Sequence, residues 1–263
     1  MLLVYICFAF YLVTSGLVVT GMFREQGHNK ILALATATTA IVLHTFILKS
    51  TILIEPGQNM SMLNVASLIG WIISITMLCA SFKVPNTILL PVVYGFTAIL
   101  VMLSQTMPSA HVIQMSVQPS LIIHVSLALF AYACLGIAFL YALQLFYINL
   151  RLKEKNASML HSSLPPLMAV EHILFKLLLI GTALLTLSLI SGFVFLDDMF
   201  TKEQAHKTVL SLIAWAIYAT IVLGHAKFGW RGKPVIMSTI IGSVLLTLAY
   251  FGSRFVREVL LNS

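Results

Sequence analysis

Eight stretches of this chain are each long and apolar enough to cross a lipid bilayer, and this constrains the fold more than any other feature. About a quarter of the residues of a soluble domain are charged, whereas only 9% are charged here. Lipid offers the backbone no hydrogen-bond partners, so each stretch must form a continuous helix. The sequence therefore predicts an all-α integral membrane protein, a polytopic bundle of eight transmembrane helices forming a single transmembrane domain over residues 1–263. The expected spans are 2–22, 31–50, 62–82, 86–105, 119–148, 173–196, 207–226 and 235–253.

Lysine and arginine residues are distributed unequally between the two ends of these spans. Ten flank one set of ends and five flank the other, and the richer side is expected in the cytoplasm. This predicts a multi-pass protein of the bacterial inner (plasma) membrane with both termini in the periplasm. The net charge of +7 is spread over alternate loops, so the lipid bilayer is an expected partner and nucleic acid is not.

The chain lacks the residue patterns of several functional classes. It has no P-loop, no G-x-S-x-G and no H-E-x-x-H sequence, so no enzyme activity is expected. No aspartate or glutamate lies in the middle of a span, which argues against a proton-coupled transporter. The cysteines, Cys7, Cys79 and Cys134, fall within spans without a C-x-x-C or C-x-x-C-H spacing and are interpreted as packing residues.

Two histidines inside the spans are candidate iron ligands. Counting 1.5 Å per residue, His44 lies about 9 Å below the outer end of the second span, and His124 lies at a similar depth in the fifth. Each shares its helix face with small residues, namely Ala33, Ala37 and Ala40, and Ala128, Ala131, Ala138 and Ala142. Such faces admit a flat ligand or a close helix neighbour. The pair predicts a bis-histidine site for haem iron, with haem b as the expected cofactor. The alternative is that each histidine hydrogen-bonds a neighbouring helix.

A second pair, His172 and His225, lies near the predicted cytoplasmic face. Consecutive helices are usually neighbours, so an inner site is one interpretation, with Glu171, Lys176 and the loop 227–233 near haem propionates. The alternative is anchoring at the lipid headgroups. Three other histidines, His28, His111 and His161, are expected on the surface, and His206 is expected in a polar cap.

Three segments carry a resemblance to a known family. The first is GTALLTLSLISGFVF followed by HKTVLSLIAWAIYATIVLGHAKFGWRGK, over residues 181–232. The second is LIIHVSLALFAYACLGIAFLYALQL around His124, and a weaker third is Asn64–Ser67–Leu68. Together these resemble the cytochrome c assembly family, the haem-handling membrane proteins of the CcsA, CcmC and HemX types, and most closely its short inner-membrane members.

The resemblance implies haem binding, with His124 in the place of an outward-facing ligand and His225 in that of a membrane-embedded one. Two family features are absent: the tryptophan-rich loop expected between Phe195 and Lys207, and the outer histidine expected near residues 253–255. The chain is therefore expected to handle haem without attaching it to apocytochrome. His44 is a candidate replacement for the missing outer ligand.

A haem-free role is the alternative prediction. The chain would then be a scaffold or accessory subunit of another membrane system, such as metal-ion transport, with a membrane-protein partner. Pigment in the purified protein separates the two hypotheses.

Overall fold

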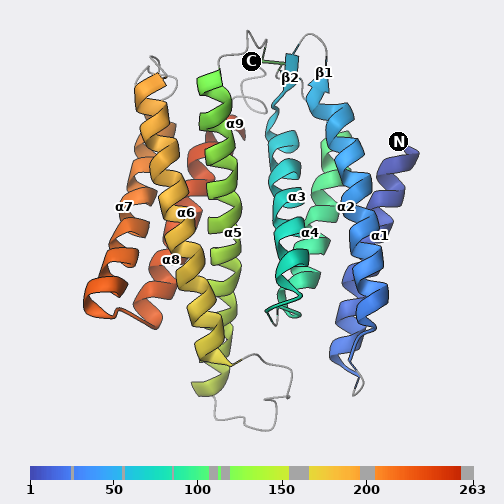
Figure 1. Ribbon diagram of the computed structural model, residues 1–263, viewed down its shortest axis with the longest axis horizontal. Helices are drawn as coiled ribbons and strands as arrows, with labels where there is room; N and C mark the ends of the chain where they lie inside the picture. The colour runs from blue at the N-terminus through green and yellow to red at the C-terminus, as the bar shows by residue number, and fades with distance from the viewer. Residues whose placement is uncertain are drawn as a thin grey trace. The chain divides into compact units, whose positions relative to one another are not determined.

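The computed structural model describes residues 1–24, 27–54, 57–84, 86–106, 112–113, 119–153, 166–195 and 205–255. Within these ranges eight helices are long and apolar enough to cross a membrane, which confirms the predicted all-α polytopic fold. The chain divides into two compact units, Met1–Ser116 and Val117–Ser263, whose helices are drawn in Figure 1. A single domain over 1–263 stays a prediction.

Unit 1 contains four of the long helices. Its elements are α1 (Leu2–Met22), α2 (Lys30–Ile52), β1 (Leu53–Ile54), β2 (Gly57–Asn59), α3 (Met62–Ala80), α4 (Leu89–Thr106) and β3 (Val112–Ile113). Helices α1 and α3 each pack against both α2 and α4. The strands form a small antiparallel sheet of order β1-β2-β3, which the sequence analysis did not predict because each strand has only two or three residues.

Side-chain caps explain where two of these helices begin. The Asn29 side chain accepts a hydrogen bond from the Leu32 N–H at 3.1 Å, at the start of α2. The Ser61 hydroxyl accepts one from the Asn64 N–H at 3.5 Å, at the start of α3. Both caps use the residue types that satisfy free N–H groups in a first helical turn.

Hydroxyl groups link the helices of unit 1 across its apolar interior. Thr14 of α1 donates to Thr36 of α2 at 2.9 Å, and Ser74 of α3 lies 3.1 Å from the hydroxyl of Thr97 on α4. The buried Cys7 thiol lies 3.4 Å from the Ala40 carbonyl oxygen, in agreement with a packing role for this residue. Such contacts between helices are typical of membrane bundles, where lipid gives no hydrophobic drive for association.

Unit 2 contains the other four long helices. Its elements are α5 (Pro119–Lys153), α6 (Leu167–Phe195), α7 (Ala205–Phe228), α8 (Lys233–Thr247), the π-helical turn η2 (Leu248–Gly252) and α9 (Ser253–Phe255). Helix α5 runs along α6 and also contacts α8, and α7 packs against α6 and α8. Gly181 permits the close approach of α6 to α5, because a Cβ there would lie 2.7 Å from the Leu135 side chain.

Helix α6 begins earlier than the sequence predicted, at Leu167 rather than at 173. The predicted start was placed after the polar residues Glu171 and His172, but Pro166 precedes the helix and the backbone continues through both. Two family-motif residues connect the helices that follow: the indole N–H of Trp215 on α7 donates to the Thr186 hydroxyl on α6 at 2.8 Å.

Much of each helix surface faces outward. Only 22% to 44% of the residues in each apolar window are buried, and large apolar side chains such as Phe46, Phe96 and Leu179 are exposed. In water these faces would be unstable, but acyl chains cover them without cost.

Candidate functional site

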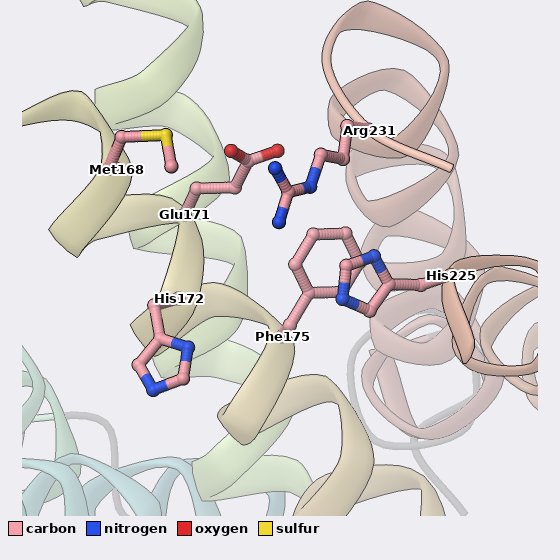
Figure 2. Close-up of a pocket in the computed structure, with 6 residues that line it drawn as sticks. All are labelled: Met168, Glu171, His172, Phe175, His225 and Arg231. Carbon is pink, nitrogen blue, oxygen red and sulfur yellow. The ribbon is translucent and has the colours of Figure 1, made fainter. Parts of the chain in front are cut away.

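A pocket of about 260 Å³ lies in unit 2 between the first turns of α6 and the end of α7 (Figure 2). The residues that line it are Met168, Glu171, His172, Phe175, His225 and Arg231. The first four come from α6, His225 comes from α7, and Arg231 comes from the turn before α8. The fold thus places His172 and His225, the predicted inner pair, on one pocket.

The turn between α7 and α8 shapes this pocket. Gly229 and Gly232 have φ angles of +67° and +74°, a backbone region that L side chains rarely adopt. The chain folds back so that the Trp230 N–H donates to the Gly224 carbonyl at 3.3 Å. A Cβ on Gly224 would collide with the Trp230 ring, so the glycine allows the indole to lie against α7.

The turn also orients His225. Its Nδ1 lies 2.9 Å from the Trp230 carbonyl oxygen, and since a carbonyl only accepts, Nδ1 carries a proton. In the neutral imidazole Nε2 then has a free lone pair. The His225 ring also stacks on Phe175, with centroids 3.4 Å apart and planes 11° apart. A fixed ring with one free nitrogen is the usual state of a metal-ligating histidine.

The remaining polar side chains of the pocket carry opposite charges. Glu171 of α6 and Arg231 of the α7–α8 turn both line it, and Figure 2 shows their side chains extending toward each other. His172 is exposed, and among the residues that the structure describes its ring has no hydrogen-bond partner. The pocket therefore combines one oriented imidazole, one unconstrained imidazole and a guanidinium able to bind a carboxylate.

His124 is oriented in the same way as His225, elsewhere in unit 2. Its Nδ1 lies 2.9 Å from the Ser188 carbonyl oxygen and 3.2 Å from the Ser191 hydroxyl, both on α6. The carbonyl again requires a proton on Nδ1 and leaves Nε2 with a lone pair in the neutral form. The ring is half-buried.

His44 has a different environment. It is fully buried in unit 1, its Nδ1 lies 3.1 Å from the Tyr11 hydroxyl on α1, and its Nε2 lies 2.9 Å from the Ser67 hydroxyl on α3. Both ring nitrogens are therefore engaged, and the imidazole joins three helices. This is the neighbour-bonded arrangement given above as the alternative to iron ligation.

The small-residue faces beside these histidines are covered by protein. Ala37 and Ala40 on α2, and Ala131, Ala138 and Ala142 on α5, are all at most 1% exposed. They serve helix packing here. His44 lies in unit 1 and His124 in unit 2, so their joint ligation of one iron stays a prediction.

The sequence pattern did not predict Tyr11, Phe175 or Trp230 as residues that orient these histidines. Tyr11 on α1 gave no signal, because contacts between helices leave no spacing pattern. Phe175 lies three residues after His172 and so on the same helix face, a signal that was available. The Trp230 carbonyl acts through the backbone, which a side-chain pattern does not reveal. The segment 196–204, His111 and His161 lie outside the described residues.

Comparison with known proteins agrees with the motifs. The family described as "Cytochrome C assembly protein" matches residues 31–261. Inner membrane protein YpjD of Escherichia coli (strain K12) is 38% identical over 252 residues, which cover 95% of this chain and 95% of that protein. A cytochrome c biogenesis protein CcsA of Prochlorococcus marinus (strain MIT 9301) is 28% identical over 156 residues, 51% of this chain and 50% of that protein. No solved structure matches the chain. The family match over most of the sequence confirms the predicted resemblance, and the chain belongs to the cytochrome c assembly protein family.

Proposed function

We propose that this chain is a multi-pass protein of the bacterial inner membrane that binds haem b non-covalently, with His124 and His225 as its principal iron ligands. Family membership and the similarity to an inner membrane protein support the haem-handling role and the location. The basic residues on alternate loops support periplasmic termini. Non-covalent binding follows from the absence of any C-x-x-C-H sequence.

The observation that carries the proposal is shared by the two histidines. In each, Nδ1 is held by a backbone carbonyl at 2.9 Å, Ser188 for one and Trp230 for the other. Such a hydrogen bond fixes the tautomer and raises the basicity of Nε2, the nitrogen that would reach iron. His44, with both nitrogens engaged, lacks this feature, and its ligation would require the release of Tyr11 or Ser67.

The inner pocket fits one part of a haem. Its volume of about 260 Å³ is below the roughly 300–1,000 Å³ of sites that enclose a whole small molecule, so most of the macrocycle would lie outside it. His225 would contact the metal, Phe175 would hold the imidazole plane, and Arg231 would pair with a propionate. When bound, haem would supply an iron centre that takes an imidazole nitrogen as a ligand.

The chain would retain or relay haem and would not attach it covalently to another protein. The segment 196–204 and the first residues of α7 contain no tryptophan, unlike the family's haem loop. We therefore expect neither apocytochrome attachment nor another enzyme activity.

A haem-free scaffold is the second candidate, because one specific observation favours it. The buried Tyr11–His44–Ser67 contacts join three helices in unit 1, and such contacts support a structural use for a histidine inside a span. On this reading a stoichiometric membrane-protein partner copurifies without pigment.

An absorption spectrum of the full-length protein in detergent tests the proposal. We expect a Soret band that weakens strongly in His225→Gly and in His124→Gly. Free imidazole added to either variant should restore the band, because it replaces the missing ligand. The matched control is His28→Ala, at a histidine outside both sites.

A colourless wild type that takes up no added haemin would reject haem binding. Soret bands of equal strength in all variants would reject His124 and His225 as the iron ligands. Failure of imidazole to rescue, together with early thermal unfolding, would assign the two histidines a structural role instead.

A further inference from the structure

A second cavity lies in unit 1, separate from both histidine sites. It has a volume of about 440 Å³ and opens where α1 ends, α2 begins and α3 is followed by α4. This is the predicted cytoplasmic end of the unit. The haem proposal does not use it.

The mouth of this cavity is positively charged. Lys30 at the start of α2 and Lys83 after α3 line it, together with His28. No acidic side chain lines the cavity within the described part of the chain, and neither lysine has an ion-pair partner there. The start of α2 adds the positive end of a helix dipole. An anionic group is therefore favoured at this position.

The inner wall of the cavity is mostly apolar. Its buried polar residues include Thr14, which donates to Thr36, and Asn86, which donates to the Met77 carbonyl. Val18, Ala33, Leu78 and Leu90 line this wall, and so does Tyr94, which is 1% exposed and stacks on Tyr11 with centroids 5.9 Å apart. Among the residues that the structure describes, the Tyr94 hydroxyl has no hydrogen-bond partner. A buried hydroxyl without a partner is unfavourable, and an acceptor oxygen that reached it from the cavity would satisfy it.

These features match the polar region of a glycerophospholipid. Its phosphate lies at the membrane surface and its ester carbonyls lie deeper, next to the acyl chains. Tyr94 is five residues along α4 from Leu89, about 8 Å deeper than the helix start. A free phosphate would reach the lysines but would leave the tyrosine unsatisfied.

We propose that this cavity binds one anionic phospholipid. The phosphate pairs with Lys30 and Lys83, and the Tyr94 hydroxyl donates to an ester carbonyl. Basic pockets between transmembrane helices on the cytoplasmic side are known to take anionic lipid headgroups. The bound lipid would join the ends of α1, α2 and α4 and so stabilise unit 1.

Native mass spectrometry of the full-length, delipidated protein tests this. Phosphatidylglycerol, phosphatidylcholine of the same chain length and inorganic phosphate are added in parallel. We expect one phosphatidylglycerol per chain and weaker phosphatidylcholine binding. Tyr94→Phe removes only the hydroxyl and should weaken binding of both lipids by about fivefold, the value of one hydrogen bond. The double variant Lys30→Gln, Lys83→Gln should abolish the preference for phosphatidylglycerol.

Lys49→Gln is the matched control, because Lys49 is an exposed lysine at the other end of α2. It should bind as the wild type does. Equal phosphatidylglycerol binding by the wild type, Tyr94→Phe and the double variant would overturn the proposal. So would competition by inorganic phosphate at the same concentration as lipid, because the cavity would then be a simple anion site.

Discussion

The His225 imidazole lies flat on the Phe175 ring, with centroids 3.4 Å apart and planes 11° apart, while its Nδ1 lies 2.9 Å from the Trp230 carbonyl oxygen. One contact fixes the ring plane and the other fixes its rotation within that plane. The direction of Nε2 therefore depends on an α6 side chain and on the α7–α8 turn together. Each of these two contacts can be removed by its own substitution.

Phe175→Leu removes the stacked ring and keeps an apolar side chain. Aromatic stacking contributes about 0.5–1.5 kcal/mol beyond simple burial, so haem retention should fall about two- to tenfold. Haemin titration of the purified variant measures this. Phe96→Leu is the control, since Phe96 is exposed on α4 in unit 1 and does not line the pocket. Equal loss in both variants would contradict a specific role for Phe175.

Gly224→Ala tests the second contact. The new Cβ would collide with the Trp230 ring, so the turn must shift and the Trp230 carbonyl must move away from His225. Overpacking of this kind costs about 1–3 kcal/mol, and we expect a lower thermal midpoint in detergent and a weaker Soret band.

The control is Gly16→Ala. Nothing lies within 4 Å of a Cβ on Gly16. Gly16→Ala should leave both measurements unchanged, or raise the midpoint slightly because alanine favours helix. An unaltered Soret band in Gly224→Ala would show that the turn does not orient the ligand.

The sequence predicted the fold well because bilayer thickness sets helix length directly. All eight spans are present. The largest difference at a helix start is in α6, where the polar residues Glu171 and His172 lie inside the helix. The small sheet was missed because its strands are too short for alternation to be visible.

The site was predicted only in part. Adjacent helices and shared depth were enough to place His172 and His225 near one pocket. The state of each imidazole depends on its partners, which come from other helices or from the backbone. Thus His44 and His124 look equivalent in the sequence. Among the described residues, however, both ring nitrogens of His44 have partners, whereas only Nδ1 of His124 has one.

Tyr11→Phe should destabilise unit 1 without changing haem uptake. The substitution leaves the buried Nδ1 of His44 without its hydrogen-bond partner, at a cost of about 0.6–2 kcal/mol for a bond between membrane helices. His44→Ala should cost more because it also leaves a cavity. Thermal unfolding and haemin titration are measured on the same samples. A normal unfolding midpoint with loss of the Soret band in His44→Ala would instead support His44 as an iron ligand beside His124.

Binding of anionic lipid should strengthen as the pH falls, through His28. Partial burial and the nearby Lys30 charge lower the pKa of His28 below its ordinary value of 6.5, so in the lipid-free protein this group favours unfolding as the pH falls below that value. A lipid phosphate would favour the imidazolium and raise the pKa, so binding takes up protons. The other ionisable groups that line the cavity are Lys30, Lys83 and Tyr94. We expect phosphatidylglycerol affinity to rise about threefold between about pH 7.5 and about pH 5.5, since a rise of half a pKa unit has that effect. His28→Gln should show no such rise in native mass spectrometry, and an equal pH response in the variant would exclude His28 as its source.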